Sequence, residues 1–184
     1  MIYIAYNRLG SPGMSVQGNS VEDRLLKLQL RLAQLEKQES CRENFLDFVG
    51  TMWPDFISGR HHRIIAEKLE RVARGELKRL IINMAPRHTK SEFASFLFPA
   101  WMMGKNPGMK IIQATHTTEL AVNFGRKTKN LIDSDEFKTV FPEVKLAADS
   151  KASGRWDTSR GGMYYAVGVG SNLAGRGGDL VIID

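Results

Sequence analysis

Apolar residues near the start of the chain recur every three or four positions, with charged and amide side chains between them. The stripe consists of Val21, Leu25, Leu28, Leu32 and Leu35. Such spacing predicts an amphipathic helix, and Ser20 is placed to cap its N-terminus. The stripe covers about two heptads, fewer than the three or four that indicate a coiled coil. Packing on its own domain and binding of a partner both remain open.

Two further helices are expected before the pattern changes. One covers residues 41–52 and stops before Pro54, and the other covers residues 61–74 and stops at Gly75. The apolar face of the second helix is expected to contain Ile64, Ile65, Leu69 and Val72. These stretches favour a helical region ahead of the first strand.

From residue 80 onward, short apolar runs alternate with helical stretches. The expected strands are residues 80–84 (LIINM), 110–115 (KIIQAT), 163–170 (MYYAVGVG) and 179–184 (DLVIID). Helices are expected between them at residues 90–103 and 118–132. Strands that are apolar throughout and alternate with helices are typical of a parallel sheet covered on both faces. We therefore predict an α/β fold with three layers.

The same patterns divide the chain into three parts. Residues 1–19 carry scattered Gly, Ser, Pro and Asn without a period, which indicates a loose leader. Residues 20–55 form a helical N-terminal extension, and residues 56–184 form the α/β domain.

Composition narrows the class of protein. The 184 residues are 42% hydrophobic and 25% charged, which suits a globular domain with its own core. No run approaches the roughly 18 apolar residues that a membrane span needs. A single cysteine, Cys41, excludes an internal disulfide framework and suits a reducing cytosol.

The positive charge is concentrated in one segment. The chain has a formal net charge of +6, and residues 60–90 alone carry nine Lys and Arg against three Glu, a difference of +6. A basic segment permits a nucleic acid as partner, although a solvated surface is the more usual explanation of such a run.

The turn after residues 80–84 has the composition of a phosphate-binding loop. It reads Ala85-Pro86-Arg87-His88-Thr89-Lys90-Ser91. Lys90 would reach the β- and γ-phosphates of a nucleotide, and the Ser91 hydroxyl would hold Mg²⁺ at the start of a helix. The usual spacing would place glycines at Met84 and Thr89, and neither is present. A basic turn with a Ser/Thr cap is the alternative.

A second strand supplies the acidic partner that such a loop requires. Residues 180–184 are four aliphatic residues followed by Asp184. A nucleotide hydrolase of this class uses an aspartate at the end of a strand to order the water shell of Mg²⁺. The loop and Asp184 together favour a site for ATP and Mg²⁺.

Three stretches in this order resemble the large terminase subunit of tailed bacteriophages, the ATP-driven motor that packages DNA into procapsids. They are LIINMAPRHTKSEFASFLFPAWMMGKNP, KIIQATHTTELAVNFGRKTKNLI and GVGSNLAGRGGDLVIID, within residues 56–184. The resemblance implies a P-loop NTPase fold of the additional-strand class, with Walker A at the loop and Walker B at Asp184. Thr89 departs from the family, because many relatives carry glycine before the lysine.

The resemblance implies roles for further residues. Arg87 matches the loop arginine of the family, and Pro86, His88 and Thr89 would complete the phosphate cradle. Trp53, Phe56 and the cluster His61-His62-Arg63 lie where relatives hold the adenine, and Phe56 and His61 are the residues expected to contact it. A hydrophobic patch that closes the helical extension explains them equally.

For two other segments the resemblance implies a role, and a simpler structural explanation is also open. Arg176, between glycines, would stabilise the transition-state charge, or would merely pair with Asp179 to shape its turn. Residues 115–117 resemble the segment that couples nucleotide to DNA, and a helix cap at Thr117 is the alternative.

The family resemblance also implies partners and a place of action. These are double-stranded DNA bound without sequence preference, the portal protein, the small terminase subunit and other copies in a homo-oligomeric ring. The activity would take place in the cytoplasm of the infected bacterium, in an assembly complex absent from the mature virion, with no role for a membrane.

The chain stops at Asp184, where family members continue with an acidic catalytic residue and a nuclease domain. We therefore expect residues 1–184 to be a piece truncated at the Walker B strand, with little ATP hydrolysis on its own. Two alternatives remain: another DNA-dependent NTPase of the additional-strand class, such as a helicase, and a non-catalytic DNA-binding or assembly module.

Overall fold

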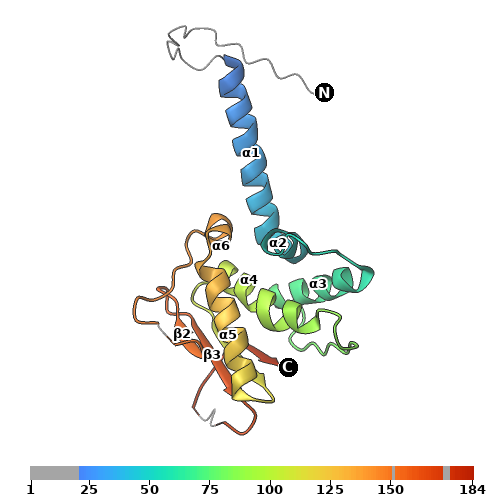
Figure 1. Cartoon of the computed structure of the whole chain (residues 1–184), viewed down its shortest axis with the longest axis vertical. Coiled ribbons are helices and arrows are strands. Elements are labelled where there is room, and N and C mark those ends of the chain that lie inside the picture. The colour runs from blue at the N-terminus through green and yellow to red at the C-terminus, as the bar shows by residue number, and fades with distance from the viewer. Residues whose placement is uncertain (1–20, 151, 172–174) are drawn as a thin grey trace, which may run out of the picture. The chain divides into compact units, whose positions relative to one another are not determined.

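The N-terminal apolar stripe lies on a long helix, α1, which spans Val21–Glu43 (Figure 1). The computed structural model describes residues 21–150, 152–171 and 175–184. The expected leader at 1–19 and the Ser20 cap therefore lie outside the described residues. By its internal contacts, the chain divides into residues 1–35 and residues 36–184.

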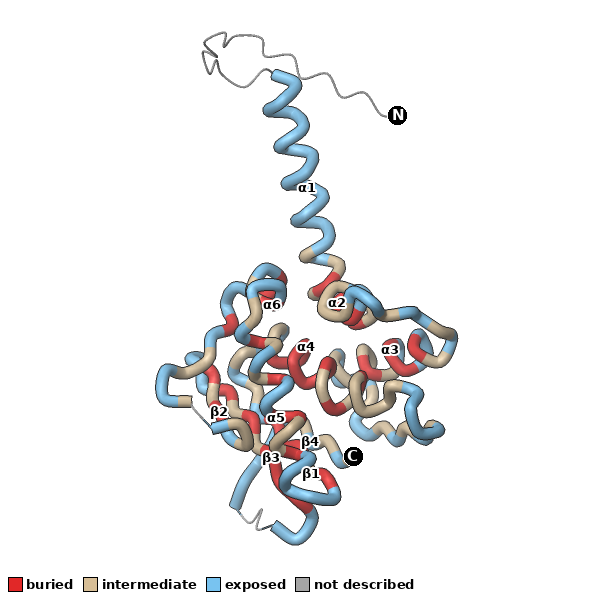
Figure 2. Tube along the Cα trace, in the orientation of Figure 1, coloured by how far each residue is buried: buried red, intermediate tan, exposed pale blue. Residues whose placement is uncertain are grey.

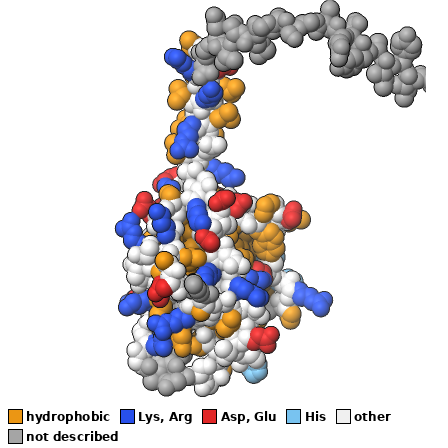
Figure 3. Space-filling model, turned by 60° about the vertical axis from the view of Figure 1, so that its left-hand side comes forward, with side chains coloured by type: hydrophobic (Ala, Val, Ile, Leu, Met, Phe, Trp, Pro, Cys, Tyr) orange, Lys and Arg blue, Asp and Glu red, His pale blue; other side chains and the backbone are white. Residues whose placement is uncertain are grey.

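The stripe of α1 lies at the surface. Its five members are between 45% and 81% exposed, and Figure 2 colours this part of the helix pale blue. Orange hydrophobic side chains are visible along it in the space-filling view (Figure 3). The predicted helix is confirmed, and its apolar side is available at the surface of the first unit.

The second helix begins later than the sequence pattern suggested. Residues 41–43 complete α1, and α2 spans Phe45–Met52. The break occurs because Asn44 caps α2, its side-chain oxygen accepting from the backbone N–H groups of Leu46 and Asp47. A single helix over 41–52 was therefore wrong at its start.

The third helix, α3, spans Arg60–Ala73 and is followed by Gly75 at φ 75°, as expected of a helix stop. Its buried side differs from the predicted face. Ile64 is 49% exposed, whereas His62 is only 6% exposed and lies with Ile65 on the buried side. Apolar periodicity predicted that Ile64 would be buried on this helix, but His62 is buried instead.

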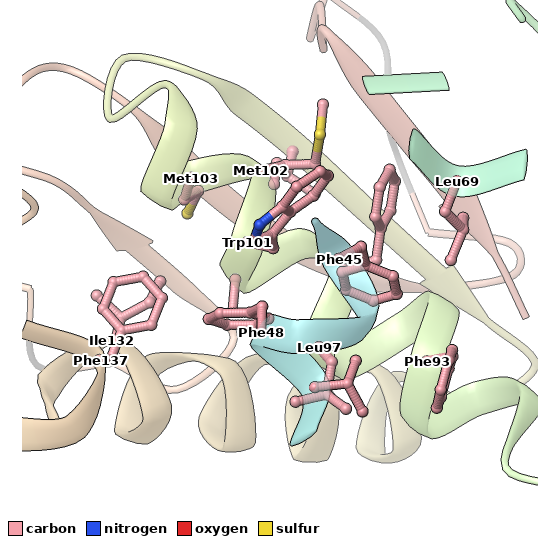
Figure 4. Packing of buried hydrophobic residues seen from close by; sticks show 14 of the residues in the cluster. Phe45, Phe48, Leu69, Phe93, Leu97, Trp101, Met102, Met103, Ile132 and Phe137 are labelled. Atoms are coloured by element: carbon pink, nitrogen blue, oxygen red, sulfur yellow. The ribbon is translucent and has the colours of Figure 1, made fainter. Parts of the chain in front are cut away.

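The main core of the second unit is aromatic. Phe45 and Phe48 of α2, residues that sequence placed in the extension, are fully buried there. Figure 4 shows them next to Trp101, whose indole N–H donates to the Cys41 carbonyl oxygen at 2.9 Å. Phe45 also meets Phe93 edge to face, with ring centroids 5.7 Å apart. These contacts fix the helix that follows the candidate loop.

The run at residues 80–84 is not a strand, which corrects the sequence prediction. Its apolar side chains partly pack on the core, but a cleft of about 770 Å³ lies between residues 77–82 and residues 179–184, the segment that contains the last strand. Apolar character explains burial, whereas a strand also needs a hydrogen-bonded neighbour. No described strand pairs with this run.

The predicted helix over 90–103 is confirmed, with an irregular centre. Its middle is a π-helix, η1, at Glu92–Leu97, and α4 continues over Phe98–Lys105. Pro99 lacks the N–H that would bond to the carbonyl of Ser95, which helps explain why wider turns precede it. The helix nevertheless runs without a break from Lys90 to Lys105.

The sheet contains four described strands in the order β2-β3-β1-β4. They span Arg155–Asp157 (β2), Met163–Gly168 (β3), Lys110–Thr115 (β1) and Leu180–Ile183 (β4). β3 and β4 both pair with β1 in parallel, and β2 pairs antiparallel with β3. The mixed α/β architecture and three of the expected strands are confirmed.

Helix α5, Thr118–Asp133, packs on one face of this sheet and leads into α6, Asp135–Val140. Gly125 is required on this helix because a Cβ there would lie 2.5 Å from the Ser153 carbonyl oxygen and 3.1 Å from the Tyr164 ring. On the opposite face, Val181 is 55% and Ile183 80% exposed. Coverage of both faces is therefore wrong for the β4 part of the described sheet.

None of the helices in the described residues is both long enough and apolar enough to cross a membrane.

Candidate functional site

Lys90 and Asp184 meet at the start of the helix that follows the loop at residues 85–91. The Lys90 ammonium nitrogen lies 3.1 Å from one carboxylate oxygen of Asp184. The Ser95 hydroxyl donates to the other oxygen at 2.8 Å. Asp184 follows β4 directly, and its backbone N–H donates to the Ala114 carbonyl oxygen of β1. The sheet therefore fixes the carboxylate, and the helix brings the cation to it.

The Asp184 carboxyl is held in its ionised form. Burial acts first and raises its pKa, but hydrogen bonds from Ser91, Ser95 and Lys90, together with the Lys90 charge, outweigh it and lower the pKa below its ordinary value. The side chain is 13% exposed, whereas that of Lys90 is 38% exposed. A fixed anion thus faces a cation on a long side chain that can still reach solvent.

The loop itself bends through the left-handed region of backbone conformation twice. Arg87 has φ 64° and Thr89 has φ 62°, although neither is glycine. The Thr89 carbonyl then accepts from the Phe93 N–H at 3.0 Å, which starts the helix. The conformation that glycine readily provides before lysine is therefore present here with threonine.

The side chains of the loop point to different surroundings. Pro86, Arg87 and His88 are exposed, and the His88 ring nitrogen Nδ1 lies 2.9 Å from the Pro86 carbonyl oxygen. Thr89 and Lys90 are half-buried. Residues 86–88 are therefore accessible to a ligand, whereas residues 89–90 pack partly against the rest of the protein.

His62 of α3 contacts the loop from the buried side. Its Nε2 lies 2.7 Å from the Thr89 hydroxyl, and its Nδ1 accepts from the Gly59 N–H at 2.9 Å. Burial and the neighbouring His61 both lower the pKa of His62, so its ring is neutral near pH 7. The resemblance placed His62 near an adenine, within the cluster at residues 61–63, and a contact with the loop was not predicted.

The two residues expected near an adenine, Phe56 and His61, lie around this ring. The Phe56 centroid is 4.8 Å from that of His62 and 5.4 Å from that of Phe93. His61 lies against His62 with centroids 3.8 Å apart. Phe56 thus contributes to an aromatic cluster beside the loop, the arrangement that the hydrophobic-patch alternative describes.

Arg176 does not join the cluster around Lys90. Its guanidinium lies 4.2 Å from the centroid of the Tyr165 ring on β3, a cation–π contact. Asp179, the partner in the alternative explanation, instead accepts from the backbone N–H of Lys110 at 2.8 Å.

The segment at residues 115–117 contains the helix cap that was the structural alternative for it. The Thr117 hydroxyl caps α5 by accepting from the Leu120 N–H at 3.2 Å. The predicted cap is therefore confirmed.

The charged groups around Asp184 suit a hydrated divalent cation bound together with phosphate. Mg²⁺ is usually held by one or two protein oxygens, with waters and phosphate oxygens completing its shell. Ser91 and Asp184 provide a hydroxyl and a carboxylate of this kind, and Lys90 provides a charge for phosphate. Among the described residues there is no cluster of three or more His, Cys, Asp or Glu side chains that would form a metal cage.

Ser95 had no predicted role, and the burial of His62 was not predicted, although local spacing indicates both. Ser95 stands four residues after Ser91, one helical turn further on, so both hydroxyls face Asp184. His62 precedes Ala66 by four residues and Leu69 by seven, which is the spacing of a buried helix face.

Comparisons of this chain with protein-family models, with curated proteins and with solved structures found no match.

Proposed function

We propose that this chain is the ATPase part of a phage terminase large subunit, which couples ATP hydrolysis to translocation of viral DNA into the procapsid. The motif resemblance suggests the family. The observation that carries the proposal is the pairing of Lys90 with Asp184 at 3.1 Å, at the junction of the loop and the parallel sheet. Ligands of α/β proteins bind at this carboxyl edge of the strands.

The loop residues would bind the phosphates. Lys90 lies at the N-terminus of a helix, where free N–H groups and the helix dipole favour an anion. Its ion pair with Asp184 is partly exposed, so the pair is weak and its ammonium group is free to turn to a stronger anion. The exposed Arg87 would contact the same phosphates from the other end of the turn.

Ser91 and Asp184 would hold the magnesium ion that accompanies ATP. Mg²⁺ supplies charge neutralisation on the β- and γ-phosphates. Asp184 is suited to this role because its lowered pKa keeps it ionised at neutral pH. Ser95 would keep the carboxylate oriented through its 2.8 Å hydrogen bond when Lys90 turns away.

The basic segment would contribute to DNA binding. Of its nine cations, Arg71 and Arg74 pair with Glu76, whereas Arg60, Lys78 and Arg79 are exposed. Figure 3 shows Lys and Arg side chains spread over one face among acidic ones, with no single stripe. Lys and Arg side chains of this kind would contact DNA phosphates, which carry no sequence information. We place this activity in the host cytoplasm, with the portal, the small subunit and further copies of the chain as partners.

Hydrolysis measured with and without duplex DNA tests the proposal. The intact protein should hydrolyse ATP only with Mg²⁺, and two duplexes of unrelated sequence should stimulate it equally. A chelator and a single-stranded oligonucleotide serve as controls. Absence of hydrolysis under all conditions, or stimulation by one sequence alone, would contradict a packaging motor.

Salt dependence of DNA binding provides a second readout. Affinity should fall steeply with salt and equally for both duplexes, because cations that bind phosphate release counterions. A complex that is insensitive to salt and selective for sequence would indicate a regulator instead.

A further inference from the structure

The residue before Lys90 is a threonine in a conformation that threonine rarely adopts. Thr89 has φ 62°, in the left-handed region. That region brings the Cβ of an L-residue close to its following carbonyl, and a β-branched side chain there is a genuine outlier. A conformation of this kind persists only where surrounding contacts hold it. The contacts of Thr89 must therefore hold the loop in this conformation.

The Thr89 hydroxyl lies in a hydrogen-bond chain whose protons can be assigned. His62 Nδ1 accepts from the Gly59 N–H, so in the neutral ring the proton is on Nε2. Nε2–H then donates to the Thr89 hydroxyl at 2.7 Å. The hydroxyl in turn donates to the His88 carbonyl oxygen at 2.6 Å. Each group in the chain uses its donor and acceptor once.

The His62 ring is a rigid support for this chain. It is 6% exposed and stacks on Phe93, with centroids 5.0 Å apart and ring planes 21° apart. Phe56 meets it at 64°, and Phe93 belongs to the helix that the loop begins. The ring therefore joins α3, the loop and η1 at one point.

We propose that His62 is a positioning residue that holds Thr89 in the left-handed conformation and thereby orients the loop N–H groups and Lys90 toward phosphate. Glycine adopts the left-handed conformation readily because it has no side chain, whereas Thr89 is held in that conformation by its hydrogen bond with His62. The orientation toward phosphate rests on the proposed function, whereas the clamp on Thr89 does not. His62 itself needs no contact with the nucleotide.

Three variants separate a clamp from a simple core residue. His62→Phe keeps an aromatic ring but removes both hydrogen bonds. Thr89→Gly removes the hydroxyl and also the strain, so that the loop no longer needs the clamp. The double variant combines them. Titration of a fluorescent ATP analogue with Mg²⁺ into each protein measures the affinity of the loop.

His62→Phe should weaken binding roughly 10-fold in the chain with Thr89, the effect of losing one well-placed hydrogen bond to a strained loop. In the Thr89→Gly background, the same change should cost less than about 2-fold. Equal losses in the two backgrounds would show that His62 acts only through core packing, and would overturn the proposal while leaving nucleotide binding intact.

Urea unfolding of the same four proteins keeps the proposal testable if no nucleotide binds. The two substitutions should be non-additive in unfolding free energy, because each removes part of one interaction. Non-additivity without any nucleotide binding would support the clamp and refute the ATPase proposal. Additive effects would refute the clamp whether or not ATP binds.

Discussion

The loop at residues 85–91 is held by charges on one side and by a neutral buried ring on the other. On the charged side, formed by Lys90, Ser91, Ser95 and Asp184, the cation is 38% exposed and its ion pair can be exchanged for another. On the ring side, formed by His62, Thr89 and Phe93, the histidine is 6% exposed, so its ring is largely shielded from water. From this contrast we propose ligand chemistry for the first side and control of loop geometry for the second.

The largest expected effect comes from removing the cation of the charged side. In the intact protein, Lys90→Ala should abolish ATP turnover, because a preorganised charge on the transferred phosphoryl group is lost. The melting temperature should change little, since the ion pair with Asp184 is partly exposed. Steady-state hydrolysis and thermal unfolding measure the two effects.

Lys127→Ala is the matched control for Lys90→Ala. Lys127 lies on α5, and its ammonium group pairs at 2.8 Å with Glu92, which belongs to the helix that begins at Lys90. The control variant should retain normal turnover. Wild-type hydrolysis by Lys90→Ala would remove the loop from the active site.

Arg176 belongs to neither side, and we propose that it acts on the site of a neighbouring subunit. Arg176→Ala should reduce turnover by roughly 10³, the lower range for an arginine that stabilises phosphoryl transfer. Rings that mix this variant with Lys90→Ala subunits should recover part of the activity at mixed interfaces. Arg160→Ala, another exposed arginine paired with Glu143, is the control.

Mixed rings that assemble but recover no activity would refute action in trans. In that case the contact of Arg176 with Tyr165 would stand as its role within the subunit.

Asp184→Asn should separate the effect of the metal from that of the phosphates. The amide cannot balance Mg²⁺, so ATP affinity in the presence of Mg²⁺ should fall roughly 10-fold or more. Affinity in the presence of a chelator should stay equal or rise, because Lys90 no longer has a competing carboxylate. Asp133→Asn, which removes an exposed pair with Lys138, is the control. Equal losses with and without Mg²⁺ would exclude Asp184 from the metal site.

Acid should act on the two sides at different pH. The pKa of His62 lies below its ordinary value of 6.5, so on acidification this histidine is protonated in the unfolded chain before it is protonated in the folded protein. The contribution of His62 to the free energy of unfolding therefore falls as pH drops below about 6.5. The pKa of Asp184 lies below 3.8, so its contribution persists until pH falls below that value. Between these limits, only the ring side should weaken.

Urea midpoints at pH 7 and pH 5 measure this difference. The wild type should lose stability on acidification, and His62→Phe should lose less. His61 lies beside His62, and the rings of Phe56 and Phe93 are its other neighbours, so subtracting the variant isolates His62. Identical losses in the two proteins would show that the pKa of His62 is the same in the folded and unfolded states.

The two sides also differ in how far the sequence predicts them. The charged side could be predicted because Lys90-Ser91 follows an apolar run and Asp184 ends another, which are local patterns. The ring side depends on α3 packing against the loop, 27 residues further along the chain, and no local pattern encodes that contact. Burial of His62 was further hidden by Ile64, a stronger apolar signal on the exposed side of the helix.

Pairing of strands was harder to predict than their apolar character. Residues 110–115 and 180–183 form strands, as their composition predicted, and the two strands pair with each other, which was not predicted. Residues 80–84 have the same composition but no described partner strand, because the cleft beside β4 separates them from the sheet. The three-residue β2 is too short to show a period at all.

The central claim is that residues 85–91 bind the phosphates of a nucleotide, and calorimetric titration of Mg²⁺-ATP into the purified chain tests it most directly. We expect one binding site per chain, weaker binding of AMP because the β- and γ-phosphates are missing, and at least a 10-fold loss of affinity in Lys90→Ala. Absence of binding by the folded wild-type chain, or binding that Lys90→Ala leaves unchanged, would contradict the claim.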